Sequence, residues 1–147
     1  MIALLDVSVL VALFDDGHVG HEAAHDWFTD NGALGWATCP ITESGIMRVL
    51  GNPSYATGFT PILEIAARLD AFCAATDHHF WPDDVSFRNR TRFHLDGVRG
   101  YRQLTDVYLL GLAVQHGGRF VTLDQRVSLA AVKGAMRASL EVIASAE

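Results

Sequence analysis

Short apolar segments alternate with longer amphipathic segments along almost the whole chain, and this alternation limits the fold more than any other feature of the sequence. The short segments fit buried strands of a parallel sheet. The longer segments repeat apolar residues at helical spacing. Strands that alternate with helices predict an α/β fold, here a three-layer α/β/α sandwich with a mainly parallel central sheet.

The same pattern predicts the bounds of the elements. The expected strands are Ile2–Leu5, Leu34–Ala37, His79–Trp81, Arg119–Thr122 and Leu140–Ala144. The expected helices are Val7–Phe14, His18–Thr29, Ile41–Leu50, Pro61–Ala75, Leu104–His116 and Val127–Val132. We expect Thr105 to cap the start of its helix and Gly117-Gly118 to end that helix. The charged segment 82–100 has no clear periodicity.

Length and composition indicate one soluble domain. The chain has 147 residues, of which 50% are hydrophobic, and we expect a single domain over residues 1–147. Cys39 and Cys73 lie in no metal-ligand motif, so we expect free thiols in a reducing compartment. The apolar run Val7–Phe14 is far shorter than the ~20 residues of a membrane span. These features predict a cytoplasmic protein that does not bind a membrane.

Charge is distributed unevenly although the net charge is −6. Seven acidic residues and no Lys or Arg precede Arg48. A basic segment follows later, with arginines at positions 88, 90, 92, 99 and 102 and only Asp96 opposing them. This segment is either a solvated loop or a surface that contacts phosphates.

Four acidic residues lie where an expected strand ends or an expected helix begins. Asp6 and Asp124 follow strands, while Glu43 and Asp106 start helices. The carboxyl ends of parallel strands share one edge of a sheet, and ligands bind in the crevice there. Each acid alone has a structural explanation, because carboxylates favour first helical turns and Asp often caps helices or closes turns. Together on one edge, the four predict a shared site.

Clustered carboxylates repel one another and need a counter-charge when they are desolvated. A hard cation with oxygen ligands meets this need, so the four acids predict a Mg²⁺ or Mn²⁺ site. The hydroxyls of Ser8 and Thr122 could orient a water or a ligand there, or could serve simple turn bonding. Such a metal activates water and neutralises charge on a phosphate, which points to phosphodiester hydrolysis.

Three segments resemble the PIN domain, and more narrowly the VapC toxins of type II toxin–antitoxin modules. They are MIALLDVSVLVALFD, CPITESGIMRVL and QLTDVYLLGLAVQHGGRFVTLD. They lie in the family order and, with their spacing, cover nearly the whole chain. By this resemblance the family's acidic quartet and its small polar position after the first acid fall on Asp6, Glu43, Asp106, Asp124 and Ser8.

The resemblance implies a Mg²⁺- or Mn²⁺-dependent endoribonuclease that leaves 5′-phosphate and 3′-hydroxyl ends. It also implies cleavage of tRNA or rRNA, a homodimer, and inhibition by a cognate VapB-like antitoxin that inserts a segment into the active-site groove. The sequence departs from the family at two positions. Val127 stands where many relatives carry an aromatic residue, and Leu110 stands where some PIN domains carry a fifth acid. The choice between one and two metals therefore stays open.

A competing motif, His21-Glu22-Ala23-Ala24-His25, spells HExxH on an expected helix, which by itself would indicate a zinc peptidase. The metzincin extension would need Gly and His where Phe28 and Asn31 stand. We therefore expect these histidines to lie on the helix surface or in a dimer or antitoxin contact.

Two other functions are compatible with the residues. One is a catalytically weak PIN-fold protein that binds RNA or an antitoxin, and the other is the same chemistry on DNA. Metal-dependent cleavage that is lost in Asp6→Ala would exclude the first. No sequence feature separates RNA from DNA, and none identifies the RNA target or the antitoxin.

Overall fold

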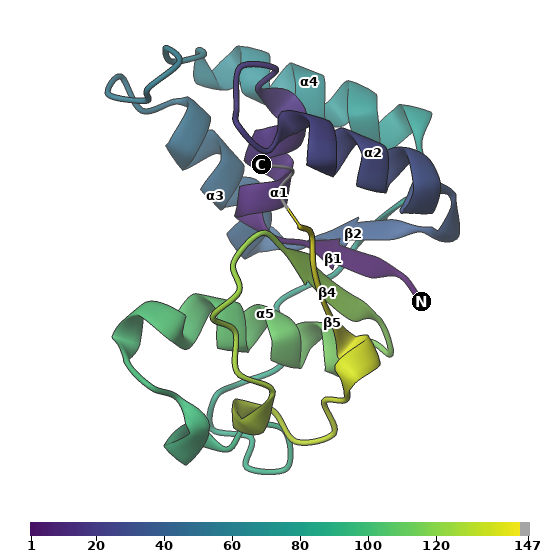
Figure 1. Cartoon of the computed structure of the whole chain (residues 1–147), viewed down its shortest axis with the longest axis vertical. Helices are drawn as coiled ribbons and strands as arrows, with labels where there is room; N and C mark the ends of the chain where they lie inside the picture. The colour runs from purple at the N-terminus through teal and green to yellow at the C-terminus, as the bar shows by residue number, and fades with distance from the viewer. Residues whose placement is uncertain (145–147) are drawn as a thin grey trace.

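The structure is a computed structural model that describes residues 1–144, and it confirms the alternation of strands and helices (Figure 1). The strands are β1 (Ala3–Leu5), β2 (Trp36–Thr38), β3 (His78–Phe80), β4 (Arg119–Thr122) and β5 (Leu140–Val142). The α-helices are α1 (Val7–Phe14), α2 (His21–Asn31), α3 (Pro40–Leu50), α4 (Ile62–Ala75) and α5 (Leu104–Gln115). The ends of every expected strand are correct to within about two residues, the usual precision of element boundaries.

The strands form one parallel sheet in the order β3-β2-β1-β4-β5. The chain moves outward from the central β1 to β2 and β3, and then returns to β4 on the other side of β1. The winding direction therefore reverses between β1 and β4. In open α/β sheets, ligands bind outside the carboxyl ends of the strands at such a reversal.

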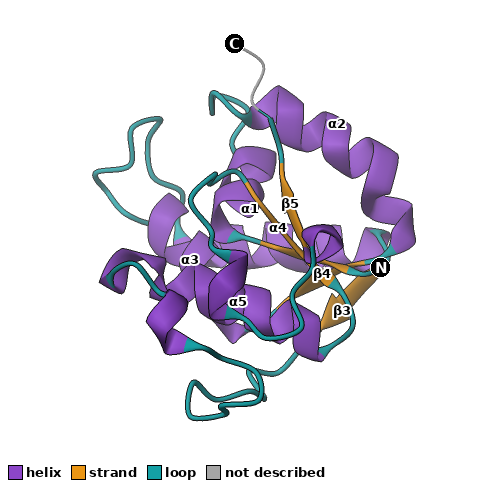
Figure 2. Cartoon of the chain, turned by 60° about the horizontal axis from the view of Figure 1, so that its bottom comes forward, coloured by secondary structure: helices purple, strands orange, loops and turns teal. Residues whose placement is uncertain are grey.

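Helices and loops cover both faces of the sheet, as the three-layer prediction requires. The helices α1 to α4 lie on one face, while α5 and the irregular segment after β3 lie on the other (Figure 1 and Figure 2). Both cores draw on the same strands, because successive side chains of a strand point to opposite faces. Ala3 and Leu5 are buried in the first core, and Leu4 is buried in the second.

The predicted cap of α5 is wrong. The helix begins at Leu104, and Thr105 is an exposed residue inside its first turn. The chain enters α5 directly from a 3₁₀ turn over Tyr101–Gln103, so Gln103 occupies the cap position without a side-chain hydrogen bond. The end of α5 is as predicted, since Gly117 follows it with a φ of 69° that favours glycine.

The predicted helix Val127–Val132 is also wrong, since only a 3₁₀ turn over Leu129–Ala131 forms there. Its backbone groups have partners elsewhere in the molecule. The carbonyl of Ala131 accepts a hydrogen bond from His94 N at 2.8 Å, and Val132 forms an antiparallel bridge with Phe93. Long-range pairing with the irregular segment thus replaces the helical hydrogen bonds.

The irregular segment 82–100 packs onto α5 through aromatic residues. Phe93 is buried, and its ring lies so close to Gly111 that an added Cβ would stand 2.3 Å from a ring carbon. The hydroxyl of Tyr108 donates to Val85 O at 2.8 Å. These contacts fix the position of α5, which carries one of the predicted site residues.

Both cysteines are free thiols, as the sequence predicts. Burial raises the pKa of the Cys39 thiol, and it raises the pKa of Cys73 to about 11. Among residues 1–144, no helix combines the length and the apolar character that crossing a membrane demands.

Candidate active site

Asp6 follows β1 as predicted, and it also caps α1. Its carboxylate accepts hydrogen bonds from Val7 N at 2.8 Å, from Ser8 Oγ at 2.8 Å and from Thr122 Oγ1 at 2.7 Å. Asp6 is only 7% exposed, and this burial raises its pKa, while the three hydrogen bonds act in the opposite direction. The side chain is therefore held in one orientation at the edge of the sheet.

Asp124 joins Asp6 from the neighbouring strand. It lies two residues beyond β4, and its backbone N–H donates to Thr122 Oγ1 at 3.0 Å. One buried hydroxyl thus links both acids. The guanidinium of Arg126 donates to the two carboxylate oxygens of Asp124 at 3.1 and 3.2 Å. These bonds hold the pKa of Asp124 below its usual range.

Asp106 reaches the same edge from the first turn of α5, as predicted. Burial raises the pKa of Asp106 to about 7, and the negative charges of Asp6 and Asp124 add to the rise. Asp124 also raises the pKa of Asp6. We call Asp6, Asp106 and Asp124 the aspartate cluster, because electrostatic repulsion links these three residues from separate elements. A cation would relieve their repulsion.

The atoms of the aspartate cluster suit a hard divalent cation. The groups around it are carboxylate and hydroxyl oxygens, which Mg²⁺ and Mn²⁺ prefer. A cationic group already lies against one of them, since Arg126 is paired with Asp124. Within residues 1–144, no three acidic, histidine or cysteine side chains converge closely enough to enclose an ion. The cluster would thus bind an ion partly through water and substrate oxygens, as is usual for Mg²⁺.

Glu43 lies in the first turn of α3, as predicted, and its side chain is hydrogen-bonded to β2. Its carboxylate accepts a hydrogen bond from Thr38 Oγ1 at 2.7 Å. The same Thr38 oxygen lies 2.8 Å from His78 Nε2 on the neighbouring strand. Glu43 is therefore anchored beside β2 and β3, next to the cluster at β1 and β4. Its role as a metal ligand stays a prediction.

Ser8 contacts the site from the first turn of α1. Its hydroxyl donates to Asp6 Oδ2 and accepts from Leu123 N at 3.2 Å. Ser8 thus joins the start of α1 to the chain leaving β4. In this structure its hydroxyl bonds to Asp6 two residues earlier, as in the alternative of simple turn bonding.

A cavity of about 260 Å³ opens beside the aspartate cluster. It is lined by Arg99, Gly100, Tyr101, Arg102, Gln103, Asp106, Asp124 and Arg126. Arg92, by contrast, donates to Gln115 Oε1 and to the carbonyl of Lys133 on a different part of the surface. The basic segment 88–102 therefore contributes its last two arginines to the acidic site, while Arg92 holds neighbouring structure together.

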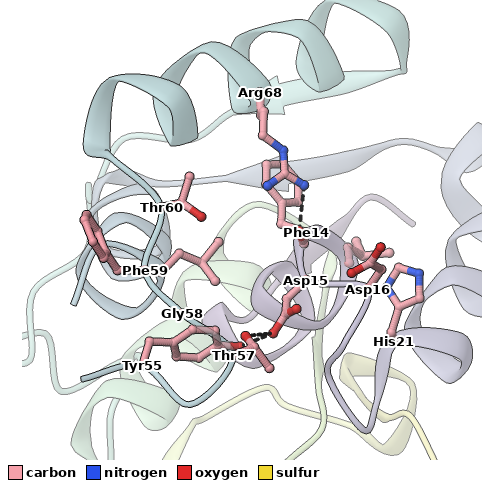
Figure 3. A pocket seen from close by; sticks show the side chains of 12 residues that line it. Phe14, Asp15, Asp16, His21, Tyr55, Thr57, Gly58, Phe59, Thr60 and Arg68 are labelled. Carbon is pink, nitrogen blue, oxygen red and sulfur yellow. Dashed lines mark hydrogen bonds between the residues drawn. The ribbon is translucent and has the colours of Figure 1, made fainter. Parts of the chain in front are cut away.

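The HExxH helix adjoins a different cavity, of about 490 Å³ (Figure 3). His21 lines it, with Nδ1 2.7 Å from Ala12 O. Asp15 accepts hydrogen bonds from Tyr55 Oη at 2.6 Å and from Thr57 Oγ1 at 2.7 Å. These bonds fasten the loop between α3 and α4 to the end of α1. None of the four predicted acids lines this cavity.

Sequence reasoning did not single out Thr38, His78, Tyr101 or Arg126. Thr38 could have been identified from its position in the sequence. A threonine that ends a strand has its hydroxyl at the edge of the sheet where the acids lie. Arg126 is two residues after Asp124, within reach of that carboxylate. His78 gave no such signal, because its contact spans 40 residues of sequence.

Comparison with known proteins gives a consistent result. Residues 3–133 match the family model described as the PIN domain. Ribonuclease VapC44 of Mycobacterium tuberculosis (strain ATCC 25618 / H37Rv) is 43% identical over 146 residues, covering 97% of this chain and 100% of the relative. Ribonuclease VapC39 of the same strain is 44% identical over 135 residues, covering 91% and 96%. Ribonuclease VapC38 is 45% identical over 125 residues, covering 85% and 86%.

Proposed function

Since this chain belongs to the PIN-domain family, as a VapC-like member, we propose that it is an endoribonuclease that requires Mg²⁺ or Mn²⁺ and serves as the toxin of a type II toxin–antitoxin pair. The main support for the proposal is the aspartate cluster, in which the pKa of Asp106 is raised. The cluster lies where the winding direction of the sheet reverses. The relatives named ribonuclease VapC support RNA as the substrate.

The aspartate cluster would hold the metal, with Glu43 as the fourth predicted acid. A divalent ion bound there would supply a water of lowered pKa and would neutralise charge on the phosphate. The hydroxyl groups of Thr122 and Ser8 orient the Asp6 carboxylate, and their hydrogen bonds partly offset the rise in its pKa that burial causes. Thr38 holds the Glu43 carboxylate at the neighbouring strand ends. The chain thus fixes its acids before substrate arrives, which lowers the cost of assembling the site.

Arg126 pairs with the carboxylate of Asp124, which a bound metal would also use. The guanidinium of Arg126 is exposed, so it would be accessible to a phosphate of the substrate.

The proposed partners follow from the same family membership. They are a tRNA or rRNA substrate, a VapB-like antitoxin and a second copy of this chain in a homodimer, all in the cytoplasm. Sequence-specific RNA recognition generally uses single-stranded loops, whose bases can be splayed out and read. We therefore propose cleavage within a loop of a structured RNA.

The test is cleavage of total RNA by purified protein free of antitoxin. Digests with Mg²⁺, Mn²⁺ or EDTA would be compared for the parent, for Asp6→Asn and for Asp30→Asn. Asp30 is an exposed acid on α2, which makes it a matched control. We expect discrete fragments from the parent and from Asp30→Asn, and none from Asp6→Asn or with EDTA.

Three results would contradict the proposal. Cleavage that survives in both Asp6→Asn and EDTA would assign the activity to a contaminant or to another site. Folded parent protein that cleaves no RNA with either metal would favour the binding-only alternative. Faster cleavage of single-stranded DNA than of RNA of the same sequence, in one competition reaction, would favour the DNA alternative.

A further inference from the structure

The cavity beside the aspartate cluster contains an exposed aromatic residue that the proposed catalysis does not use. Tyr101 begins the 3₁₀ turn that leads into α5, and it is 76% exposed. It lines the cavity together with Asp106 and Asp124. An aromatic ring left open to solvent directly beside clustered polar groups suggests a surface for a ligand.

One side chain connects the two walls of this cavity through hydrogen bonds. Gln103 Oε1 accepts a hydrogen bond from Arg99 N at 3.1 Å, and Gln103 Nε2 donates to Arg126 O at 3.0 Å. Gln103 thus joins the turn before α5 to the loop after β4. The spacing between the two walls is therefore set before a ligand binds, which reduces the entropy cost of binding.

Three arginines give this cavity a positive rim. The guanidinium of Arg102 lies over the Tyr101 ring, 5.6 Å from its centroid, and Arg102 Nε donates to Tyr101 Oη at 3.1 Å. Arg99 and Arg126 also line the cavity. This rim stands out because the whole chain has a net charge of −6. A phosphate can pair with guanidinium groups while a base stacks on an aromatic face, so the combination fits a nucleotide.

We propose that this cavity is the subsite for one nucleotide next to the scissile phosphodiester of a single-stranded RNA, with the base stacked on Tyr101 and a phosphate paired with Arg102. The proposal rests on the proposed ribonuclease function, because Asp106 and Asp124 form a wall of the same cavity. Its volume of about 260 Å³ is just below the range of about 300–1,000 Å³ for drug-sized ligands, which leaves room for one base and not for a base pair. A base can stack on Tyr101 only when it is not stacked on the neighbouring bases of its own strand. This requires single-stranded RNA.

The test measures RNA binding without cleavage. Fluorescence anisotropy of a labelled single-stranded RNA of mixed sequence would be recorded with Mg²⁺ in an Asp6→Asn background. Tyr101→Leu should weaken binding roughly 5- to 20-fold, because stacking on a base is lost, whereas Tyr101→Phe should bind within about twofold of the parent. Phe59→Leu is the matched control, since Phe59 is 56% exposed and lines the remote cavity of Figure 3.

Arg102 is tested through the salt dependence of the same binding. Arg102→Gln should lower the slope of log Kd against log salt by about 0.7, the value for one phosphate contact on a single strand. The exposed Arg137, which does not line the cavity, provides the control Arg137→Gln, for which we expect an unchanged slope. Thermal unfolding of each variant would confirm that it is folded.

Failure of this proposal differs from failure of the ribonuclease proposal. RNA cleavage by the parent with an unchanged KM in Tyr101→Leu would overturn the subsite and leave the nuclease intact. Equal weakening by Tyr101→Leu and Phe59→Leu would overturn it too. Folded parent protein that neither cleaves nor binds RNA would overturn both. Tyr101-dependent binding of an acidic peptide, with RNA binding that does not depend on Tyr101, would overturn the subsite alone.

Discussion

Replacing Asp106 with Asn should stabilise the metal-free protein above neutral pH and change its stability little near pH 4. Burial and the charges of Asp6 and Asp124 raise the pKa of Asp106 from 3.8 to about 7 in the folded chain. Between these values the folded state holds a proton that the unfolded chain has released, so stability falls as pH rises through this window and the loss is complete above about pH 7. Asn carries no charge and avoids the loss.

The size of the effect follows from the same pKa difference. A pKa of about 7 in place of 3.8 corresponds nominally to about 4 kcal/mol. Asp106 is partly open to water, which screens its charge, so we expect about 1–2 kcal/mol above neutral pH. For a chain of this length that is a rise in Tm of roughly 3–8 °C. The raised pKa of Asp6 adds a slope of the same sign, while the lowered pKa of Asp124 has the opposite sign.

The assay is thermal unfolding in EDTA, followed by circular dichroism at a series of pH values from about 3 to 8.5, a range that brackets both pKa values. Asp30→Asn on the surface of α2 controls for the loss of one charge. Adding Mn²⁺ at about 100 times its Kd should stabilise the parent by about 2.7 kcal/mol and the Asp106→Asn variant much less. A stability difference that is the same at both ends of the pH series, or a less stable Asn variant at high pH, would refute the reasoning.

Three further predictions concern stability and reactivity. Thr122→Val should cost about 1–3 kcal/mol at neutral pH by urea unfolding, because the buried hydroxyl donates to Asp6 at 2.7 Å and valine keeps only the shape; an unchanged unfolding midpoint would contradict this. Gly111→Ala should cost about 1–3 kcal/mol in the same assay, since a Cβ would meet the Phe93 ring, and a fully stable variant would show that the ring can move. The Cys73 thiol, with its pKa raised to about 11, should react with iodoacetamide near pH 8 far more slowly than the unfolded chain does; equal rates, read by mass spectrometry, would disprove it.

Much of the sheet could be predicted because β1, β2 and β4 are short, largely apolar runs with polar residues at or just beyond their ends. β1 and β2 are buried on both faces, as is typical of central strands in a parallel sheet, whereas β3 and β5 are only partly buried. Asp6 and Asp124 could be located for the same reason, because each directly follows or lies close behind such a run. Asp106 could be located because the first turn of a helix reaches the same edge in this fold.

The structural features that the sequence did not predict depend on contacts between distant segments. The stretch Val127–Val132 has helical spacing, but its backbone groups pair with His94 and Phe93. Glu43 was correctly placed at a helix start, yet local sequence carries no information about the His78 ring, which contacts the Thr38 hydroxyl that holds Glu43 beside β2 and β3. Local pattern locates a residue on an element, while the direction of its side chain depends on neighbours that only the tertiary structure supplies.

Folding alone does not explain the aspartate cluster. Asp6 caps α1, but Asn or Ser would cap a helix about as well without the burial of a charge. Asp106 gains little from its first-turn position, because burial and two neighbouring carboxylates raise its pKa to about 7 and so oppose its ionised form near neutral pH. Asp124 needs an arginine to compensate it. The three acids lie at one edge of the sheet, and none of them is the residue that would suit the fold best there. They are best explained by a cation and an anionic substrate, which the fold itself does not require.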